Sequence, residues 1–186
     1  SLGLVVALTV GGVASAEDAS KNVKSGPEQG DGLQPFYVTK IAGAEDDGVP
    51  VDKNLCYRCK NGSRPQVIVF TRSSDGKVAE LISKLDKAVA ENEDSALRVF
   101  VNVLGEDKED LSDQAKQLAA KTKAKNVPFV VPNEFENGPG NYGISPKAEV
   151  TITLATDSTV HGSRGYAKAG ELNIDSVMGE LKKMLN

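Results

Sequence analysis

The sequence has few of the residues from which metal sites and disulfide-rich scaffolds are built. It contains no Trp, two Cys and one His, and aromatic residues make up 5% of its 186 residues. Two Cys and one His cannot supply the four ligands of a structural zinc site. Two Cys cannot hold together a disulfide-rich miniature fold either. The length suits one domain with a single sizeable hydrophobic core.

Positive charge is also scarce. Lys and Arg number 22 against 26 Asp and Glu, which gives a net charge of −4 and an isoelectric point near 5.1. A nucleic-acid-binding protein normally presents a basic face to the phosphates. We therefore expect no nucleic-acid partner.

The chain begins with a segment typical of an export signal. Residues 2–13 are uncharged and mostly apolar, and Ala14-Ser15-Ala16 follows with small residues at the first and third positions of a signal-peptidase site. An apolar run of about 15 residues is shorter than the ~20 that a bilayer needs, which disfavours a membrane anchor. We interpret residues 1–16 as the remnant of a signal peptide.

Export implies a periplasmic or secreted protein whose mature chain has no membrane span. Residues 17–34 are rich in Gly, Ser and charged residues and are interpreted as a flexible linker. Residues 35–186 then form the folded domain. An oxidising compartment would let a pair of Cys persist as a disulfide.

The rest of the chain alternates between strand and helix patterns. Apolar and β-branched runs predict strands at residues 67–70, 97–103, 127–131, 150–154 and 159–164. Apolar residues spaced three and four apart predict helices over residues 78–89, 111–122 and 174–184. We expect a central mixed sheet covered by helices on both faces.

Three local features refine this prediction. Asp75 or Ser74 and Asp107 are suited to cap the first two helices. Pro128 lacks a backbone N–H, so its strand is expected at an edge or an irregular position of the sheet. Asp157-Ser158 suits the turn of a hairpin.

Three stretches carry a resemblance to a known family. They are PQVIVF from Pro65, LRVFVNVLGEDKEDLSDQAKQLAAKTKAKNVPFVVPNEF from Leu97, and NYGI from Asn141 with the strands and Gly170-Glu171-Leu172 that follow. Over residues 35–186 the chain resembles the thioredoxin-like superfamily, in particular its redoxin and peroxiredoxin branch. The resemblance implies a three-layer α/β/α sandwich with a central mixed β-sheet and a redoxin-type β-α-β insertion.

The family's reactive site is vacated in this sequence. In such proteins the reactive Cys follows the central strand, where this chain has residues 71–77 with Ser73 and Gly76 but no Cys. The family also has a cis-proline before the strand that follows the NYGI stretch, and Ala148 occupies that place here. Because the family's reactive Cys is absent from this place, we do not expect a thiol peroxidase.

A displaced Cys pair is the strongest chemical feature of the chain. Cys56 and Cys59 form a C-x-x-C motif, a spacing at which thiol pKa values are often lowered. Arg58, Lys60 and Arg64 add positive charge that would favour the thiolates. The pair precedes the central strand, so we expect it at the opposite end of the sheet from the vacated site.

Three roles for the pair remain open. One is thiol–disulfide exchange with a protein substrate, in which Cys56 attacks and Cys59 resolves the mixed disulfide. Another is a structural disulfide in a non-catalytic binding domain. The last is metal binding, for example Cu(I) on two thiolates or zinc shared by two chains. If the protein is an enzyme, it is a thiol–disulfide oxidoreductase, and we assign no cofactor.

Other candidate residues have simpler interpretations. A lone His161 on a predicted hairpin is interpreted as a surface residue. The acidic run Glu45-Asp46-Asp47 is interpreted as a solvated turn rather than a cation site. Ser73 and Ser74 are interpreted as residues of a helix cap, because no base lies near them in the sequence.

Overall fold

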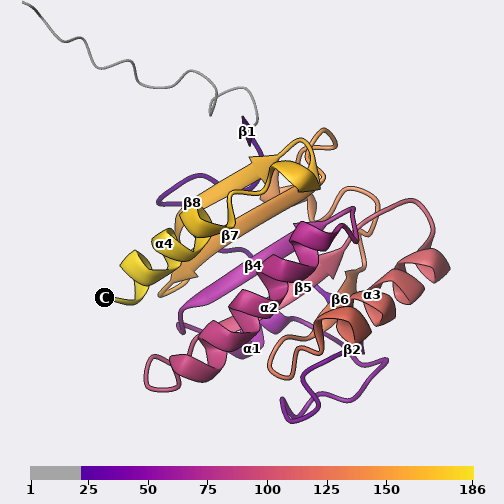
Figure 1. Ribbon diagram of the computed structural model, residues 1–186, viewed down its shortest axis with the longest axis horizontal. Helices are drawn as coiled ribbons and strands as arrows, with labels where there is room; N and C mark the ends of the chain where they lie inside the picture. Colours follow the sequence, from indigo (N-terminus) through magenta and orange to yellow (C-terminus); the bar gives the residue numbers. More distant parts are fainter. Residues whose placement is uncertain (1–21) are drawn as a thin grey trace, which may run out of the picture.

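An eight-stranded mixed sheet forms the centre of the computed structural model, which describes residues 22–186 (Figure 1). The strands, in the spatial order β1-β8-β7-β4-β5-β6-β2-β3, are β1 (Asn22–Val23), β8 (Thr159–Tyr166), β7 (Val150–Thr156), β4 (Gln66–Thr71), β5 (Arg98–Val103), β6 (Phe129–Pro132), β2 (Val38–Ala42) and β3 (Asn54–Leu55). β4, β5 and β6 run parallel, whereas the other pairings are antiparallel. The mixed sheet expected from the sequence is confirmed.

Within residues 22–186, four α-helices and two short 3-10 helices accompany the sheet. They are α1 (Tyr57–Asn61), α2 (Gly76–Glu91), α3 (Lys108–Thr122), η1 (Gly140–Tyr142), η2 (Ala169–Glu171) and α4 (Ile174–Leu185). The carboxylates of Asp75 and Asp107 accept backbone N–H groups at the starts of α2 and α3, as their positions predicted. No helix within residues 22–186 is long and apolar enough to cross a membrane.

β4 lies at the centre of the sheet, and all six of its residues are buried. Because side chains alternate along a strand, β4 contributes to two separate hydrophobic clusters. Val67 and Val69 face a cluster that contains the apolar stripes of α2, α3 and α4. Ile68 and Phe70 face a second cluster with Tyr57 of α1.

The two outer layers differ in composition. The long helices α2, α3 and α4 lie together on one face of the sheet (Figure 1). The other face is covered by the short α1 and by segments outside the helices and strands, which contribute Leu33, Phe36 and Ile144. The fold is thus the expected α/β sandwich, with one outer layer built mainly from irregular backbone.

The predicted β-α-β insertion and hairpin are both present. β5, α3 and β6 form a parallel unit, and β7 and β8 pair on either side of the turn at Asp157 and Ser158. β6 lies inside the sheet, between β5 and β2, so it is not an edge strand. The irregular position expected as the alternative is present, because the pairing of β6 with β2 contains a register shift. Pro128 is compatible with this central place because it precedes the first residue of β6. The carbonyl of Pro128 accepts the backbone N–H of Val101.

The predicted linker needs a larger correction. Residues 1–16 and the first part of the linker lie outside the described residues. From Asn22 onward the segment is packed against the sheet: β1 pairs with β8, and Leu33 is buried in the second cluster. The Ser25 hydroxyl is buried and bonds to the hydroxyl of Thr151 at 2.6 Å. These contacts tie the segment to the domain.

Candidate functional site

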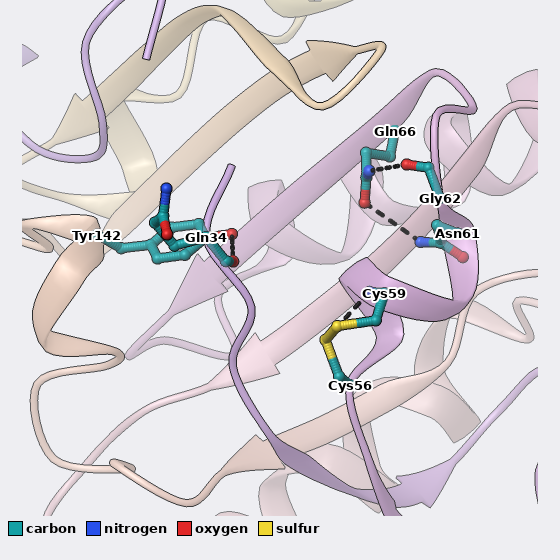
Figure 2. The surroundings of a disulfide bond; sticks show 7 residues. All are labelled: Gln34, Cys56, Cys59, Asn61, Gly62, Gln66 and Tyr142. Carbon is teal, nitrogen blue, oxygen red and sulfur yellow. Dashed lines mark hydrogen bonds between the residues drawn. A yellow bond between two sulfur atoms is a disulfide. The ribbon is translucent and has the colours of Figure 1, made fainter. Parts of the chain in front are cut away.

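The two Cys form a disulfide at the start of α1, with a Cα–Cα distance of 5.2 Å (Figure 2). Cys56 occupies the position before the first residue of the helix. Its Sγ accepts a hydrogen bond from the backbone N–H of Cys59 at 3.0 Å. A backbone donor aimed at this sulfur stabilises negative charge on it once the disulfide is reduced.

The two Cys differ in their exposure to solvent. Cys56 is 8% exposed, whereas Cys59 belongs to the exposed residues of α1. An incoming sulfur therefore reaches Cys59 more readily than Cys56. This asymmetry could not be inferred from the C-x-x-C spacing, because it depends on which side of α1 packs against the sheet.

Tyr57 anchors the disulfide helix to the sheet. Tyr57 directly follows Cys56 in the chain and is buried. Its ring stacks on Phe100 with centroids 5.7 Å apart. Its hydroxyl donates to Oδ2 of Asp47 at 2.6 Å. Burial, together with the bond to Asp47 and the negative charge of that carboxylate, raises the pKa of Tyr57 far above its ordinary value.

The same carboxylate neutralises a buried lysine. Lys40, on β2, is 1% exposed, and its Nζ lies 2.8 Å from Oδ1 of Asp47. The ammonium also donates to the carbonyls of Ala44 and Val49, so its three donors are all used. Glu45 and Asp46 are exposed in a turn, as expected, whereas Asp47 is largely shielded and paired, so the interpretation as a solvated residue is wrong for Asp47 alone. The only sequence signal was the Lys within the apolar pattern VTKIA.

The predicted cationic residues surround α1 in different ways. Arg58 is half-buried, and its charge lowers the pKa of Tyr142, although burial has the larger effect and raises that pKa. Lys60 is exposed beside Cys59. Arg64 donates to the carbonyls of Lys60 and Asn61 at 3.4 and 3.1 Å, which satisfies the last turn of the helix.

The C-terminal end of α1 is fixed next to the first residue of β4. Gly62 ends the helix with a φ of 64°, and its carbonyl accepts the side-chain amide of Gln66 at 3.5 Å. Asn61 in turn donates to Oε1 of Gln66 at 3.4 Å (Figure 2). The disulfide helix is thereby held at the end of the sheet where β4 begins.

The residues that the resemblance places at the family's reactive site lie at the other end of β4. Gly76 begins α2, and the backbone N–H of Asp75 donates to Oγ of Ser73 at 3.2 Å. The pairing of Thr71 with Val150 brings the buried Ala148 to the same end as Ser73. The structure thus gathers Ser73, Gly76 and Ala148 at one end. A six-residue strand, about 17 Å long, separates them from the Gln66 end.

Acidic and metal-ligating side chains are dispersed. Within residues 22–186, no group of three or more His, Cys, Asp and Glu side chains is arranged to hold a metal ion. His161 is exposed on β8, in agreement with its interpretation as a surface residue. The two sulfurs of Cys56 and Cys59 are bonded to each other.

Several solved structures share this architecture. AhpC of Mycobacterium tuberculosis matches with a TM-score of 0.62 and 14% identity, over 86% of this chain and 99% of that chain. A putative thiol:disulfide interchange protein DsbE from Chlorobium tepidum matches with a TM-score of 0.56 and 16% identity, over 83% of this chain and 98% of that chain. A putative protein disulfide isomerase from Bacteroides thetaiotaomicron matches with a TM-score of 0.58 and 12% identity, over 89% and 92%.

These likenesses establish the fold. It is the thioredoxin-like fold in the form found in redoxins and peroxiredoxins, as the sequence resemblance implied. No protein-family model matches the sequence, and neither does any curated protein. Because fold does not determine activity, the function must be argued from the disulfide and its surroundings.

Proposed function

We propose that the protein is a thiol–disulfide exchange protein that uses the Cys56–Cys59 disulfide. The observation that carries the proposal is the asymmetry of the pair. Cys59 is exposed to an incoming sulfur, whereas Cys56 is buried and receives a backbone hydrogen bond at its sulfur. An accessible sulfur joined to a stabilised leaving sulfur is the arrangement that disulfide exchange requires.

We propose the reverse of the order of attack expected from the sequence, because Cys59 is exposed and Cys56 is buried. A substrate thiolate attacks Sγ of Cys59, and the bond between the two protein sulfurs breaks with its electron pair on Sγ of Cys56. The Cys59 N–H stabilises this thiolate. Cys59 then carries the mixed disulfide. A second substrate thiolate attacks the substrate sulfur of this bond, and Sγ of Cys59 leaves as a thiolate. In the reducing direction Cys59 attacks the substrate and Cys56 resolves the mixed disulfide.

The surrounding charges and the structural likenesses support the same proposal. Lys60 and Arg64 flank the exposed end of α1, and cations favour thiolates by lowering thiol pKa values. Two of the proteins with a similar fold are a putative thiol:disulfide interchange protein and a putative protein disulfide isomerase. Those activities belong to those proteins, and they motivate the assay chosen for this one.

An insulin-reduction assay tests the activity. We expect the wild-type protein to accelerate reduction of insulin by dithiothreitol, and Cys59→Ser to abolish the acceleration. The reduced protein should also be alkylated by iodoacetamide at Cys59 about tenfold faster than at Cys56, since buried thiols react slowly. Wild-type activity equal to that of Cys59→Ser would refute the proposal.

A structural disulfide is the second candidate. The observation that favours it is the position of Tyr57, which lies between the Cys and anchors α1 through Phe100 and Asp47. A disulfide that closes a loop of four residues contributes only about 2 kcal/mol by chain entropy. If the disulfide is structural, its reduction potential should lie below about −300 mV. The reduction potential of an exchanging pair should lie above this value.

We also propose that the protein is exported. The apolar residues 2–13 and the small residues of Ala14-Ser15-Ala16 support a cleaved signal. The disulfide supports an oxidising compartment. Expression of the chain behind an initiator Met and basic residues, followed by cell fractionation and N-terminal mass analysis, should recover exported protein that begins at Glu17. Uncleaved protein retained in the cytoplasm would contradict this proposal.

A further inference from the structure

A cavity of about 490 Å³ opens beside the disulfide helix, at the end of the sheet where β4 and β5 begin. α1 contributes Tyr57, Lys60 and Asn61 to its wall. The remainder comes from the loop after β2, Arg64 after α1, Val89 of α2, the start of β5 and the loop before β6. Its volume falls within the range of small-molecule sites.

Positive charge is concentrated around this cavity. Four cationic residues line it, although the whole chain carries a net charge of −4: Lys60, Arg64, Arg98 and Lys125. None of the four forms an ion pair with a carboxylate of residues 22–186. Arg64 and Arg98 bond only to backbone carbonyls, which leaves further guanidinium donors for a ligand.

The carboxylates in the wall do not cancel this charge. Asp47 is already bonded to Lys40, to the Tyr57 hydroxyl and to the backbone N–H of Val49. Only Asp46 remains as an uncommitted acid, and it is exposed. Unpaired cations that converge on a concave surface attract anions, and guanidinium groups match carboxylates in a bidentate manner.

The cavity and the accessible sulfur share one helix. Lys60 lines the cavity and directly follows Cys59 in the chain. Consecutive Cα atoms are about 3.8 Å apart, so the backbone of Cys59 adjoins a residue of the cavity wall. Neither Cys lines the cavity itself, but the charged wall includes the residue next to Cys59 and lies at the same end of the sheet.

We propose that this basic cavity binds the carboxylate groups of a small anionic thiol or disulfide whose sulfur exchanges with Cys59. The inference rests on the proposed function and specifies its substrate class. With the protein reduced, the Cys59 thiolate attacks one sulfur of the bound disulfide and releases one thiolate, which takes up a proton. Cys56 then attacks Sγ of Cys59 and releases the second thiolate. One substrate disulfide is reduced, and the protein dithiol is oxidised.

Three aliphatic disulfides of similar size and different charge provide the test. They are 3,3′-dithiodipropionate, 2-hydroxyethyl disulfide and cystamine, which are dianionic, neutral and dicationic at neutral pH. Their reaction rates with the reduced protein are measured at low ionic strength by quenching with an alkylating agent and mass spectrometry. We expect the dianion to react about tenfold faster than the neutral disulfide.

The decisive variant is Arg98→Gln/Lys125→Gln, which removes two cavity charges that lie far from the Cys in the sequence. It should reduce the preference for the dianion over the neutral disulfide to about twofold or less. Lys53→Gln/Lys182→Gln removes the same charge from exposed positions outside the cavity wall and should retain the preference. Equal preferences in all three proteins would overturn the inference while exchange itself persists.

A binding measurement separates the cavity from the chemistry. Glutarate, a dicarboxylate without sulfur, is titrated into the oxidised protein, and backbone amide shifts are followed by NMR. Shifts should cluster at Lys60, Asn61 and Asn126 and disappear in the Arg98→Gln/Lys125→Gln variant. Exchange without glutarate shifts would overturn the cavity assignment. Absence of exchange with all three disulfides would refute the proposed function, whatever glutarate does.

Discussion

At the scale of single residues, Lys40 and Asp47 connect the disulfide helix to the fold. Lys40 is 1% exposed, and Asp47 bonds to both Lys40 and Tyr57. We predict that Lys40→Met lowers the free energy of unfolding by about 3 kcal/mol, because it leaves a largely buried carboxylate without its counter-charge. Urea unfolding measures the loss. Lys53→Met, at an exposed position, should change it by less than about 0.5 kcal/mol. A small loss for Lys40→Met would contradict this account.

The Tyr57 hydroxyl should make stability depend on pH in the alkaline range. The folded-state pKa of Tyr57 is raised by burial and by Asp47, whereas unfolded Tyr ionises near pH 10. The contribution of this proton to stability is therefore complete below about pH 10 and declines as the pH rises toward the folded-state pKa. The decline is about 1.4 kcal/mol per pH unit.

Tyr57→Phe removes this decline together with one hydrogen bond to a charged acceptor. At pH 8 the variant should be less stable than the wild type by about 2 kcal/mol. The two stability curves should converge between about pH 10 and pH 11.5, since only the wild type loses the Tyr57 contribution there. Chemical unfolding at a series of pH values tests this, and parallel curves would show that the hydroxyl is not responsible.

At the scale of elements, the long helices and central strands follow from the sequence, whereas the element that carries the disulfide does not. α2 and α3 have repeated apolar positions and an Asp at each start. α1 has only five residues, too few for a period to be recognised or for the helix to be stable alone. Its place depends on tertiary contacts of Tyr57, which no local pattern encodes.

The sequence patterns also did not predict β2 and β3, the strands that precede α1 in the chain. β2 places the buried Lys40 in an apolar run, and β3 has two residues. A charged residue in a strand normally indicates a solvated position. Its partner Asp47 lies seven residues away in a turn, and only the folded chain brings the two together. The C-x-x-C motif could be found from spacing, but its basic cavity could not.

The end of α1 depends on one glycine. Gly62 has a φ of 64° and a ψ of −131°, a conformation that side-chain-bearing residues rarely adopt. Its Cβ position is open, so Gly62→Ala should cost about 2 kcal/mol through backbone strain alone. Gly170→Ala is the matched control, because its Cβ position is equally open and its φ is not positive. Equal effects of the two substitutions on the melting temperature would exclude strain at Gly62.

At the scale of the whole molecule, the fold has two opposite ends with different chemistry. Residues 71–77 and Ala148 occupy the end where the resemblance implies a reactive site. The disulfide and its basic cavity occupy the end where β4 and β5 begin. A rigid sheet separates these ends by about 17 Å, which is too far for a direct contact between Ser73 and the sulfurs.

This separation predicts that the Ser73 end of the sheet can be changed without effect on exchange. Ser73→Ala removes a hydroxyl that accepts the Asp75 N–H at 3.2 Å, so a modest loss of stability, about 1 kcal/mol, is expected. Its rate of exchange with a small disulfide should stay within about twofold of the wild type, because no catalytic group has been removed. Cys59→Ser should abolish reduction of the small disulfide under the same conditions. A large loss of rate in folded Ser73→Ala, verified by circular dichroism, would mean that chemistry occurs at the Ser73 end, and the disulfide would then be left with its structural role.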